Sequence, residues 1–277
     1  MKLPNFLRSR NQGSGITSSQ LVAKDKMLTQ HHSGLHDSEN ILNRRTKKTD
    51  KTMTIGILTA MDKEYNQIAG LIEGVTTIEK TYRYAVGMIG SNRVVLTKSG
   101  IGKVNAAVGT SELIREFQPD AVISTGCAGG IDKSLKVMDV VVSRETVHHD
   151  FVLEMGYERG HIQGMPRYFE GDARLVSAAE SLQDPSIHIG LICTGDQFIT
   201  SHEALAKIKE AFPAGLAVDM ESVAIAQACY IYKVPFVSFR VISDTPGADQ
   251  HQQQYENFWE EMADKSFHTT QRFLSCL

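Results

Sequence analysis

The chain of 277 residues lacks long hydrophobic runs. No stretch of about 18 apolar residues occurs and no signal-peptide core is visible, so membrane insertion is disfavoured and we expect a soluble protein. The four cysteines, Cys127, Cys193, Cys229 and Cys276, are widely spaced and form no C-x-x-C pair. This spacing argues against a disulfide-stapled secreted domain and against a zinc site, and it predicts reduced thiols in a cytoplasmic protein.

Two phosphate-binding motifs are also missing. The chain has no G-x-x-x-x-G-K-[ST] loop, and no G-x-G-x-x-G follows the first apolar run, so ATP and NAD are disfavoured. Glycine clusters do occur at residues 99–103 and 125–130. Their backbone amides could form a cradle for a polar ligand, but ordinary strand-to-helix turns use glycine equally well.

Residues 1–52 have little apolar content and a strong basic bias. They carry ten basic and four acidic residues, whereas the remaining 225 residues carry 19 basic and 28 acidic residues. Such a segment cannot bury enough apolar surface to offset the entropy of ordering it. We therefore predict a flexible basic leader outside the fold, and a single domain over residues 53–277. The composition of the leader loosely fits a transit peptide or a nucleic-acid-binding arm, and an upstream translation artefact fits equally well.

From residue 53 onward, apolar runs alternate with segments of helical period. The predicted strands cover residues 54–59, 93–97, 121–125, 137–143, 187–193, 216–220 and 236–242. The predicted helices cover residues 61–73, 103–117, 203–211, 221–232 and 253–274. This alternation, without repeats or internal linkers, predicts an α/β fold: one three-layer α/β/α domain around a mixed, mostly parallel sheet.

Acidic residues follow two of these strands. Asp219 and Glu221 lie at the end of one strand, and Asp244 lies at the end of the last. An acid at the carboxyl end of a buried strand points into the crevice where α/β sheets bind ligands. Two such positions suggest a site whose carboxyl groups have different roles. Simpler explanations stay open, because Glu221 also fits a helix start and Asp244 also fits a turn.

Several short motifs, in this order, resemble those of the 5'-methylthioadenosine/S-adenosylhomocysteine nucleosidases, within the wider nucleoside phosphorylase superfamily. They are IGI at 55–57 leading into AMDKE at 60–64, SGIGKV at 99–104, TGCAGG at 125–130, TGDQFI at 194–199, VDME at 218–221 and RVISD at 240–244. The resemblance covers essentially all of residues 53–277. It implies a nucleoside phosphorylase-like fold and hydrolysis of these two thio-nucleosides to adenine and the 5-thioribose product, in methionine salvage and methyl-cycle recycling.

The resemblance also implies roles for individual residues. Asp244 would donate a proton toward adenine N7, and Glu64 would be the general base for the water that attacks ribose C1'. Glu221 would bind the 2' and 3' hydroxyls, with Met220 under the sugar and Arg240 helping to place the water. Cleaving an N-glycosidic bond builds positive charge on the ribose and negative charge on the base, so these residue types suit the reaction.

The remaining contacts implied by the resemblance surround the base and the 5' substituent. Phe198 would stack on adenine while the backbone near Ile199 reads its edge. The other substrate contacts are Met61, Ile101, Cys127, Ala128, Gly129, Asp219, Ser243 and Tyr255. No metal and no organic cofactor is implied. The family forms dimers, so we expect a homodimer in which residues 147–166 of the partner line the 5' end of the site.

The chain departs from the family pattern at a few positions. Cys127 stands where serine is usual, Asp219 replaces the commoner glutamate, and His161 stands where glutamine is typical. The segment between Asp244 and Tyr255 is one residue longer than the common form. Preference for the 5' substituent is therefore left open.

Other functions compete with this hypothesis. A purine nucleoside phosphorylase would need phosphate where Glu64 sits, and like charges about 4 Å apart repel by roughly 1 kcal/mol in water. Arg240 alone is a weak anion site. A non-catalytic adenine-nucleoside binding protein should lack the acid or the base, yet both are present. Binding of nucleic acid would depend on the basic leader, and we expect none.

A His148-His149-Asp150 run suggests a metal site at first sight. Adjacent residues of a strand point to opposite faces, however, so the three side chains cannot converge on one ion. We predict a polar loop or an interface role for this run.

Overall fold

The computed structural model describes residues 52–245, 255, 257–259 and 267–277. The chain divides into two units, Met1–Thr49 and Asp50–Leu277. The predicted basic leader, residues 1–52, lies outside the described residues except for Thr52, so its predicted flexibility is untested.

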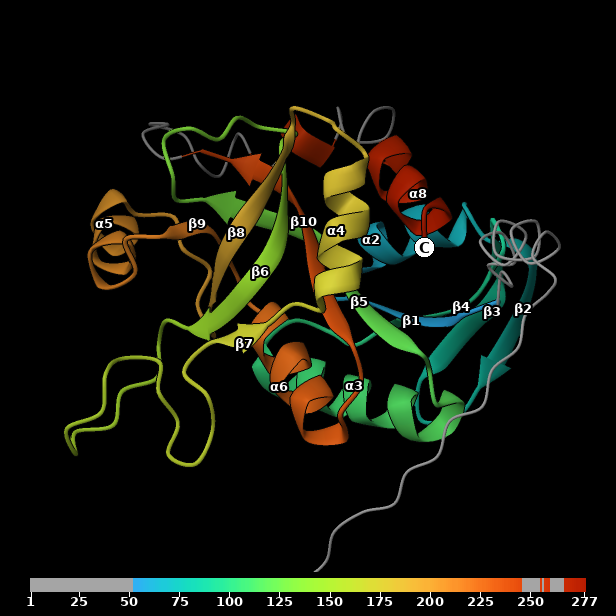
Figure 1. Cartoon of the computed structure of the whole chain (residues 1–277), viewed down its shortest axis with the longest axis horizontal. Helices are drawn as coiled ribbons and strands as arrows, with labels where there is room; N and C mark the ends of the chain where they lie inside the picture. The colour runs from blue at the N-terminus through green and yellow to red at the C-terminus, as the bar shows by residue number, and fades with distance from the viewer. Residues whose placement is uncertain (1–51, 246–254, 256, 260–266) are drawn as a thin grey trace, which may run out of the picture. The chain divides into compact units, whose positions relative to one another are not determined.

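One mixed sheet forms the centre of the domain (Figure 1). The strand order is β10-β6-β8-β9-β5-β1-β4-β3-β2, with β7 paired to β6 and an additional pairing between β10 and β5. Because β10 pairs with both β6 and β5, five strands close into a ring; β1, β4, β3 and β2 extend from β5, and β7 extends from β6. The strands are β1 (Thr54–Thr59), β2 (Glu73–Glu79), β3 (Arg83–Ile89), β4 (Asn92–Lys98), β5 (Ala121–Gly130), β6 (Val140–His148), β7 (Phe169–Glu170), β8 (Ile187–Thr194), β9 (Gly215–Asp219) and β10 (Phe236–Asp244).

Helices pack on both faces of this sheet. They are α2 (Asp62–Ala69), α3 (Lys103–Phe117), α4 (Ala173–Ser181), α5 (His202–Ala211), α6 (Ser222–Tyr232) and α8 (Phe267–Ser275). Side chains alternate along β1: Ile55 and Ile57 join a core with α2, α4 and α8, whereas Leu58 joins a core with α3 and α6. Figure 1 shows these two groups of helices on opposite sides of the strands. The predicted three-layer α/β fold with a mixed sheet is confirmed.

The strand pairings put several strand ends at one edge of the sheet. β1 runs parallel to β4 and β5, and β5 runs parallel to β10. Their carboxyl ends, at Thr59, Lys98, Gly130 and Asp244, therefore point toward the same edge of the sheet. β9 joins them through its pairing with the end of β5, where Gly129 pairs with Val218. This edge holds the candidate site.

The predicted elements agree with the structure best where they are buried. The strand at 54–59 and the helix at 103–117 have the predicted bounds. The helix predicted over 61–73 is wrong at its end, because α2 stops at Ala69 and β2 begins at Glu73. Strands β2, β3 and β7 and helix α4 were not predicted. Most residues of β2 are exposed, so its sequence carries no apolar alternation.

The C-terminal helix predicted over 253–274 is described only in part. Residues 255, 257–259 and 267–275 are helical, and the residues between them lie outside the described part of the chain. No helix within the described residues is long and apolar enough to cross a bilayer.

Candidate active site

A cavity opens at the edge of the sheet where β1, β5, β9 and β10 end. Thirteen of the fifteen predicted site residues line it. These thirteen are Met61, Glu64, Ile101, Cys127, Ala128, Gly129, Phe198, Ile199, Met220, Glu221, Ser243, Asp244 and Tyr255. The lining also includes three residues that the sequence did not single out: Ala60, Gln197 and Val218. All three lie within the quoted motifs, so the sequence left open only which way their side chains point.

Glu64 combines a helix-capping role with a place in the cavity wall. Its Oε2 accepts hydrogen bonds from the backbone N–H of Ala60 (2.8 Å) and of Met61 (3.1 Å), at the start of α2. Its Oε1 accepts from the N–H of Cys127 at 3.1 Å. The side chain is 3% exposed. Three backbone donors thus fix a buried carboxylate at the cavity.

Gly126 explains part of the glycine cluster after β5. A Cβ atom at this position would lie 2.4 Å from Glu64 Oε1 and 2.7 Å from Arg240 Nη1. No side chain fits there unless one of these groups moves. Glycine is therefore required so that the carboxylate and the guanidinium can approach the strand, which is a different reason from cradling a phosphate.

Cys127 places its thiol beside the same carboxylate. Its Sγ lies 3.6 Å from Glu64 Oε1. Burial raises the pKa of the Cys127 thiol well above its usual value, and the charge of Glu64 adds to the effect. The thiol therefore stays protonated and can donate a weak hydrogen bond to Glu64.

Glu221 lies between the loop that ends at Gly102 and a buried arginine. Its Oε1 accepts a hydrogen bond from the N–H of Gly102 at 3.0 Å, and its Oε2 is 3.6 Å from Arg240 Nη2. Gly102 has a φ of 92°, which glycine adopts without strain. Burial raises the pKa of Glu221 to about 7, whereas Arg240 and Gly102 oppose the shift. A hydroxyl donor from a ligand would stabilise the ionised form.

Arg240 and Asp219 do not line the cavity but lie directly behind it. Arg240 is 1% exposed, and its Nε is 2.9 Å from Asp219 Oδ2. Its Nη2 donates to Ser124 Oγ at 2.8 Å. Asp219 also accepts from Thr194 Oγ1 at 2.5 Å and from the hydroxyl of Ser222. The structure thus places these two predicted substrate contacts in a buried polar network that orients Glu221.

Arg240 is stabilised as a cation by the acids around it. Burial alone would lower its pKa, but Asp219, Glu221 and Glu64 together raise it above the usual value. The buried site therefore contains one arginine among several carboxyl groups, and its positive charge is already balanced.

Asp244 is the last residue of β10 and lines the cavity. It is 7% exposed, and its Oδ1 accepts a hydrogen bond from Ser243 Oγ at 2.7 Å. Gly129 packs against it, because a Cβ there would lie 3.3 Å from Asp244 Oδ2. The register of β10 against β5 shifts between Ile242 and Asp244. This irregularity turns the final side chain toward the cavity.

An aromatic wall closes another side of the cavity. The rings of Phe198 and Tyr255 meet edge to face, with centroids 5.5 Å apart. The hydroxyl of Tyr255 lies 3.6 Å from the sulfur of Met61. Burial raises the pKa of Tyr255 to about 12, so it remains a neutral donor. Phe198 is 56% exposed, which leaves a ring face free for a planar ligand.

Of the other departures from the family pattern, His161 does not line the cavity. His161 contacts the ring of Tyr157, with centroids 5.1 Å apart. Residues 246–254, which include the extra position, lie outside the described residues. Within the described residues, no group of three or more His, Cys, Asp or Glu side chains is placed to hold a metal ion.

Comparisons with known proteins agree with this geometry. The family model of the phosphorylase superfamily matches residues 54–275. A 5'-methylthioadenosine/S-adenosylhomocysteine nucleosidase from Exiguobacterium is 49% identical over 199 residues, covering 70% of this chain and 85% of the relative. A Staphylococcus aureus protein of the same name is 40% identical over 228 residues, covering 80% of this chain and all of the relative.

Solved structures are similar over the same region. A nucleosidase of this name from Colwellia psychrerythraea, in complex with adenine, has a TM-score of 0.77 and 39% identity, covering 82% of this chain and 96% of that one. The enzyme from Neisseria meningitidis, in complex with methylthio-immucillin-A, has a TM-score of 0.76 and 36% identity, covering 81% of this chain and 100% of that one.

Proposed function

Because the chain belongs to the phosphorylase superfamily and, within it, to the 5'-methylthioadenosine/S-adenosylhomocysteine nucleosidases, which are hydrolytic N-glycosidases, we propose that it cleaves both thio-nucleosides to adenine and the 5-thioribose product. The observation that carries the proposal is the set of three buried carboxyl groups, Glu64, Glu221 and Asp244, on one cavity. The residue roles below, and a place in methionine salvage and methyl-cycle recycling, are part of the proposal. A cytoplasmic location stays a prediction.

Asp244 acts as the general acid. The adenine anion is a poor leaving group, and protonation at N7 makes it neutral. The carboxyl group is buried at the end of β10, and the Ser243 hydroxyl fixes its orientation. The departing base is thereby neutralised as the glycosidic bond breaks.

Glu64 acts as the general base for water. Its three backbone hydrogen bonds hold it in one orientation at the cavity wall. A water molecule that donates to this carboxylate would be activated for attack on C1' from the side opposite the base. The same negative charge stabilises the oxocarbenium character that develops on the ribose.

The sugar and the base have separate contacts. Glu221 accepts hydrogen bonds from the 2' and 3' hydroxyls, while Met220 packs under the ribose. Phe198 stacks on adenine, and the backbone at Ile199 reads the edge of the base. Arg240 acts from behind by holding Glu221 in place.

Water is the favoured nucleophile because the cavity offers phosphate little positive charge. Arg240 is within 4 Å of Asp219 and Glu221 and is fully buried behind the lining. Bringing a phosphate dianion next to Glu64 would add like-charge repulsion in a buried site, where water screens charges little. A phosphorylase reaction is disfavoured for this reason.

Substrate selectivity provides the test of the proposed function. In phosphate-free buffer, the full-length protein should release adenine from methylthioadenosine and from S-adenosylhomocysteine, with a lower kcat/KM for adenosine and none for inosine. The measurement is chromatographic quantification of the free base. Turnover that requires phosphate, or that ignores the 5' thioether, would contradict the proposal.

We further propose that the chain forms a homodimer through an apolar surface beside the cavity. Exposed large hydrophobic side chains gather on α3, on α6 and on the segment after β6, and such patches mark interaction sites. They are Val104, Val108, Val152, Met155, Tyr230, Ile231 and Tyr232. Figure 1 shows α3 and α6 next to each other, with the loop of residues 150–168 extending nearby. In the dimer, residues 147–166 of one subunit would line the 5' end of its partner's cavity.

Sedimentation velocity tests the dimer. Ile231→Asp should shift the protein from twice the chain mass to a single chain mass and should weaken thio-nucleoside binding, because a charge cannot be buried at this surface without a partner. Val75→Asp is the matched control, since Val75 is exposed on β2 at the far edge of the sheet. If Ile231→Asp sediments as the wild type does, this surface is not the interface.

A further inference from the structure

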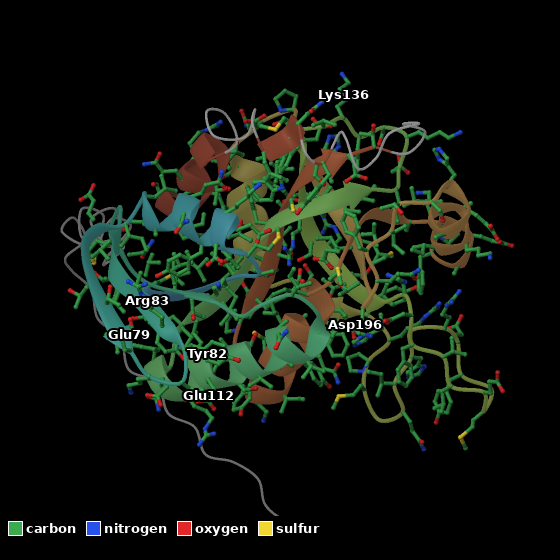
Figure 2. The ribbon with its side chains drawn as sticks, turned by 180° about the vertical axis from the view of Figure 1, so that it is seen from behind. Glu79, Tyr82, Arg83, Glu112, Lys136 and Asp196 are labelled. Carbon is green, nitrogen blue, oxygen red and sulfur yellow. The ribbon has the colours of Figure 1, made fainter. Side chains whose placement is uncertain are left out.

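A compact set of charged groups lies beside the cavity without lining it. The Nζ of Lys103 lies 2.7 and 2.8 Å from the two carboxylate oxygens of Asp150. The backbone N–H of Lys103 donates to Asp196 Oδ1 at 2.7 Å, and the N–H of Asp196 donates to Asp150 Oδ2 at 2.8 Å. Figure 2 shows Asp196 beside the first turn of α3. We call Lys103, Asp150 and Asp196 the charged clamp.

Each member of the charged clamp belongs to a different segment next to the cavity. Lys103 follows Gly102, whose N–H holds Glu221 on the sugar side. Asp196 precedes Gln197 and Phe198, which line the base side. The charged clamp therefore connects the two halves of the cavity wall through a residue that begins α3.

Asp150 brings in a third segment, the end of β6. The preceding His149 packs closely on the base-side loop, because a Cβ at Gly195 would lie 2.4 Å from His149 Nε2. This accounts for the His148-His149-Asp150 run, in which the acid binds a lysine and no metal cluster forms within the described residues. Of the predicted polar loop or interface role, the polar contacts of Asp150 fit the first, His148 is the last residue of β6, and the interface role stays a prediction.

The charged clamp is partly shielded from water. The side chains of Lys103 and Asp150 are 19% and 27% exposed. Burial alone would raise the pKa of Asp150, but the ammonium of Lys103 and the N–H of Asp196 lower it below the usual value. Charge-assisted hydrogen bonds in such partly buried settings are stronger than exposed surface pairs.

We propose that Lys103 is a positioning residue that holds the base-stacking loop at Phe198 in register with the sugar-binding Glu221. This inference rests on the proposed function, which assigns Glu221 to the sugar and Phe198 to the base. Glu64 and Asp244 are anchored at α2 and β10, which supply none of the three residues of the charged clamp. Loss of the charged clamp should therefore weaken substrate binding more than it slows the chemical step.

The kinetic test replaces Lys103 with methionine, which keeps the length and removes the charge. Lys103→Met should raise KM for methylthioadenosine about tenfold while kcat falls less than about threefold, the size expected for losing charge-assisted hydrogen bonds. Lys103→Arg keeps a cation and should restore most of the affinity. The matched control is Lys209→Met, which breaks a partly buried ion pair with Asp132 away from the cavity and should leave KM unchanged.

A double-mutant cycle and hydrogen exchange complete the test. Asp150→Asn and Lys103→Met together should raise KM little more than either alone, because both remove the same contact. Amide exchange over residues 195–199 and 100–104 should accelerate in Lys103→Met and not in Lys209→Met. Exchange is read without turnover, so an inactive wild type would overturn the proposed function and leave this test intact. Equal KM values and equal exchange rates in the two lysine variants would overturn the positioning role proposed for Lys103.

Discussion

Asp244→Asn should abolish adenine release while substrate binding persists. The asparagine keeps the shape of the side chain at the end of β10 and can still accept the hydrogen bond from Ser243. It cannot transfer a proton to N7, so the base would have to leave as an anion. A general acid of this kind contributes roughly 10²- to 10⁴-fold to the rate. We expect a fall in kcat of this size, measured by single-turnover adenine release, with methylthioadenosine affinity within a few-fold of wild type by calorimetry.

The control for this variant is another aspartate-to-asparagine change outside the cavity. Asp139 pairs with His188 at 3.1 Å and does not line the site. Asp139→Asn should leave kcat and KM unchanged. Near-normal turnover in Asp244→Asn would remove this residue from the mechanism.

Glu64→Gln should have an effect of similar size on kcat, for a different reason. The amide cannot take a proton from water, which removes the general base. One end of the amide must also present an NH₂ group to backbone donors that now bind carboxylate oxygens, at Ala60, Met61 or Cys127. An unsatisfied buried donor costs about 1–3 kcal/mol, so the variant should also unfold at a lower temperature.

Stability and chemistry can be separated in this variant. Glu203 is an exposed acid in the first turn of α5, away from the cavity, so Glu203→Gln is a control for charge at a helix start. Thermal unfolding by calorimetry shows whether Glu64→Gln is folded at the assay temperature. If the folded variant keeps more than about a tenth of wild-type kcat, then Glu64 is a helix cap and not the base.

The buried part of the fold could be predicted from the sequence because burial leaves a pattern. The strand Thr54–Thr59 is apolar throughout, and α3 has an apolar period over all of Lys103–Phe117. Strand β2 is mostly exposed, so no apolar pattern in its sequence marks it as a strand. Its extended conformation is instead stabilised by antiparallel pairing with β3. The closure of five strands into a ring depends on the pairing of β10 with both β5 and β6, which local sequence does not encode.

The location of the site could be predicted from the sequence, but which residues line the cavity and which lie behind it could not. Acids after two strands pointed to the correct edge of the sheet, while Glu64, at a helix start, was ambiguous until its contact with Cys127 brought it to the same cavity. Asp219 and Arg240 were expected to touch substrate, and they lie one layer behind.

The connection of Lys103 to Asp150 and Asp196 spans 47 and 93 residues of chain. No local pattern in the sequence marks contacts between residues so far apart. The reason for glycine at position 126 was equally hidden, since it depends on the approach of Glu64 and Arg240.

The identity of the sugar product tests the central claim, that water activated by Glu64 is the nucleophile. Methylthioadenosine is incubated with the full-length protein with and without saturating inorganic phosphate, and the products are identified by mass spectrometry. We predict unphosphorylated 5-methylthioribose and adenine in both buffers at the same rate. Formation of a sugar 1-phosphate, or a rate that depends on phosphate, would contradict the account.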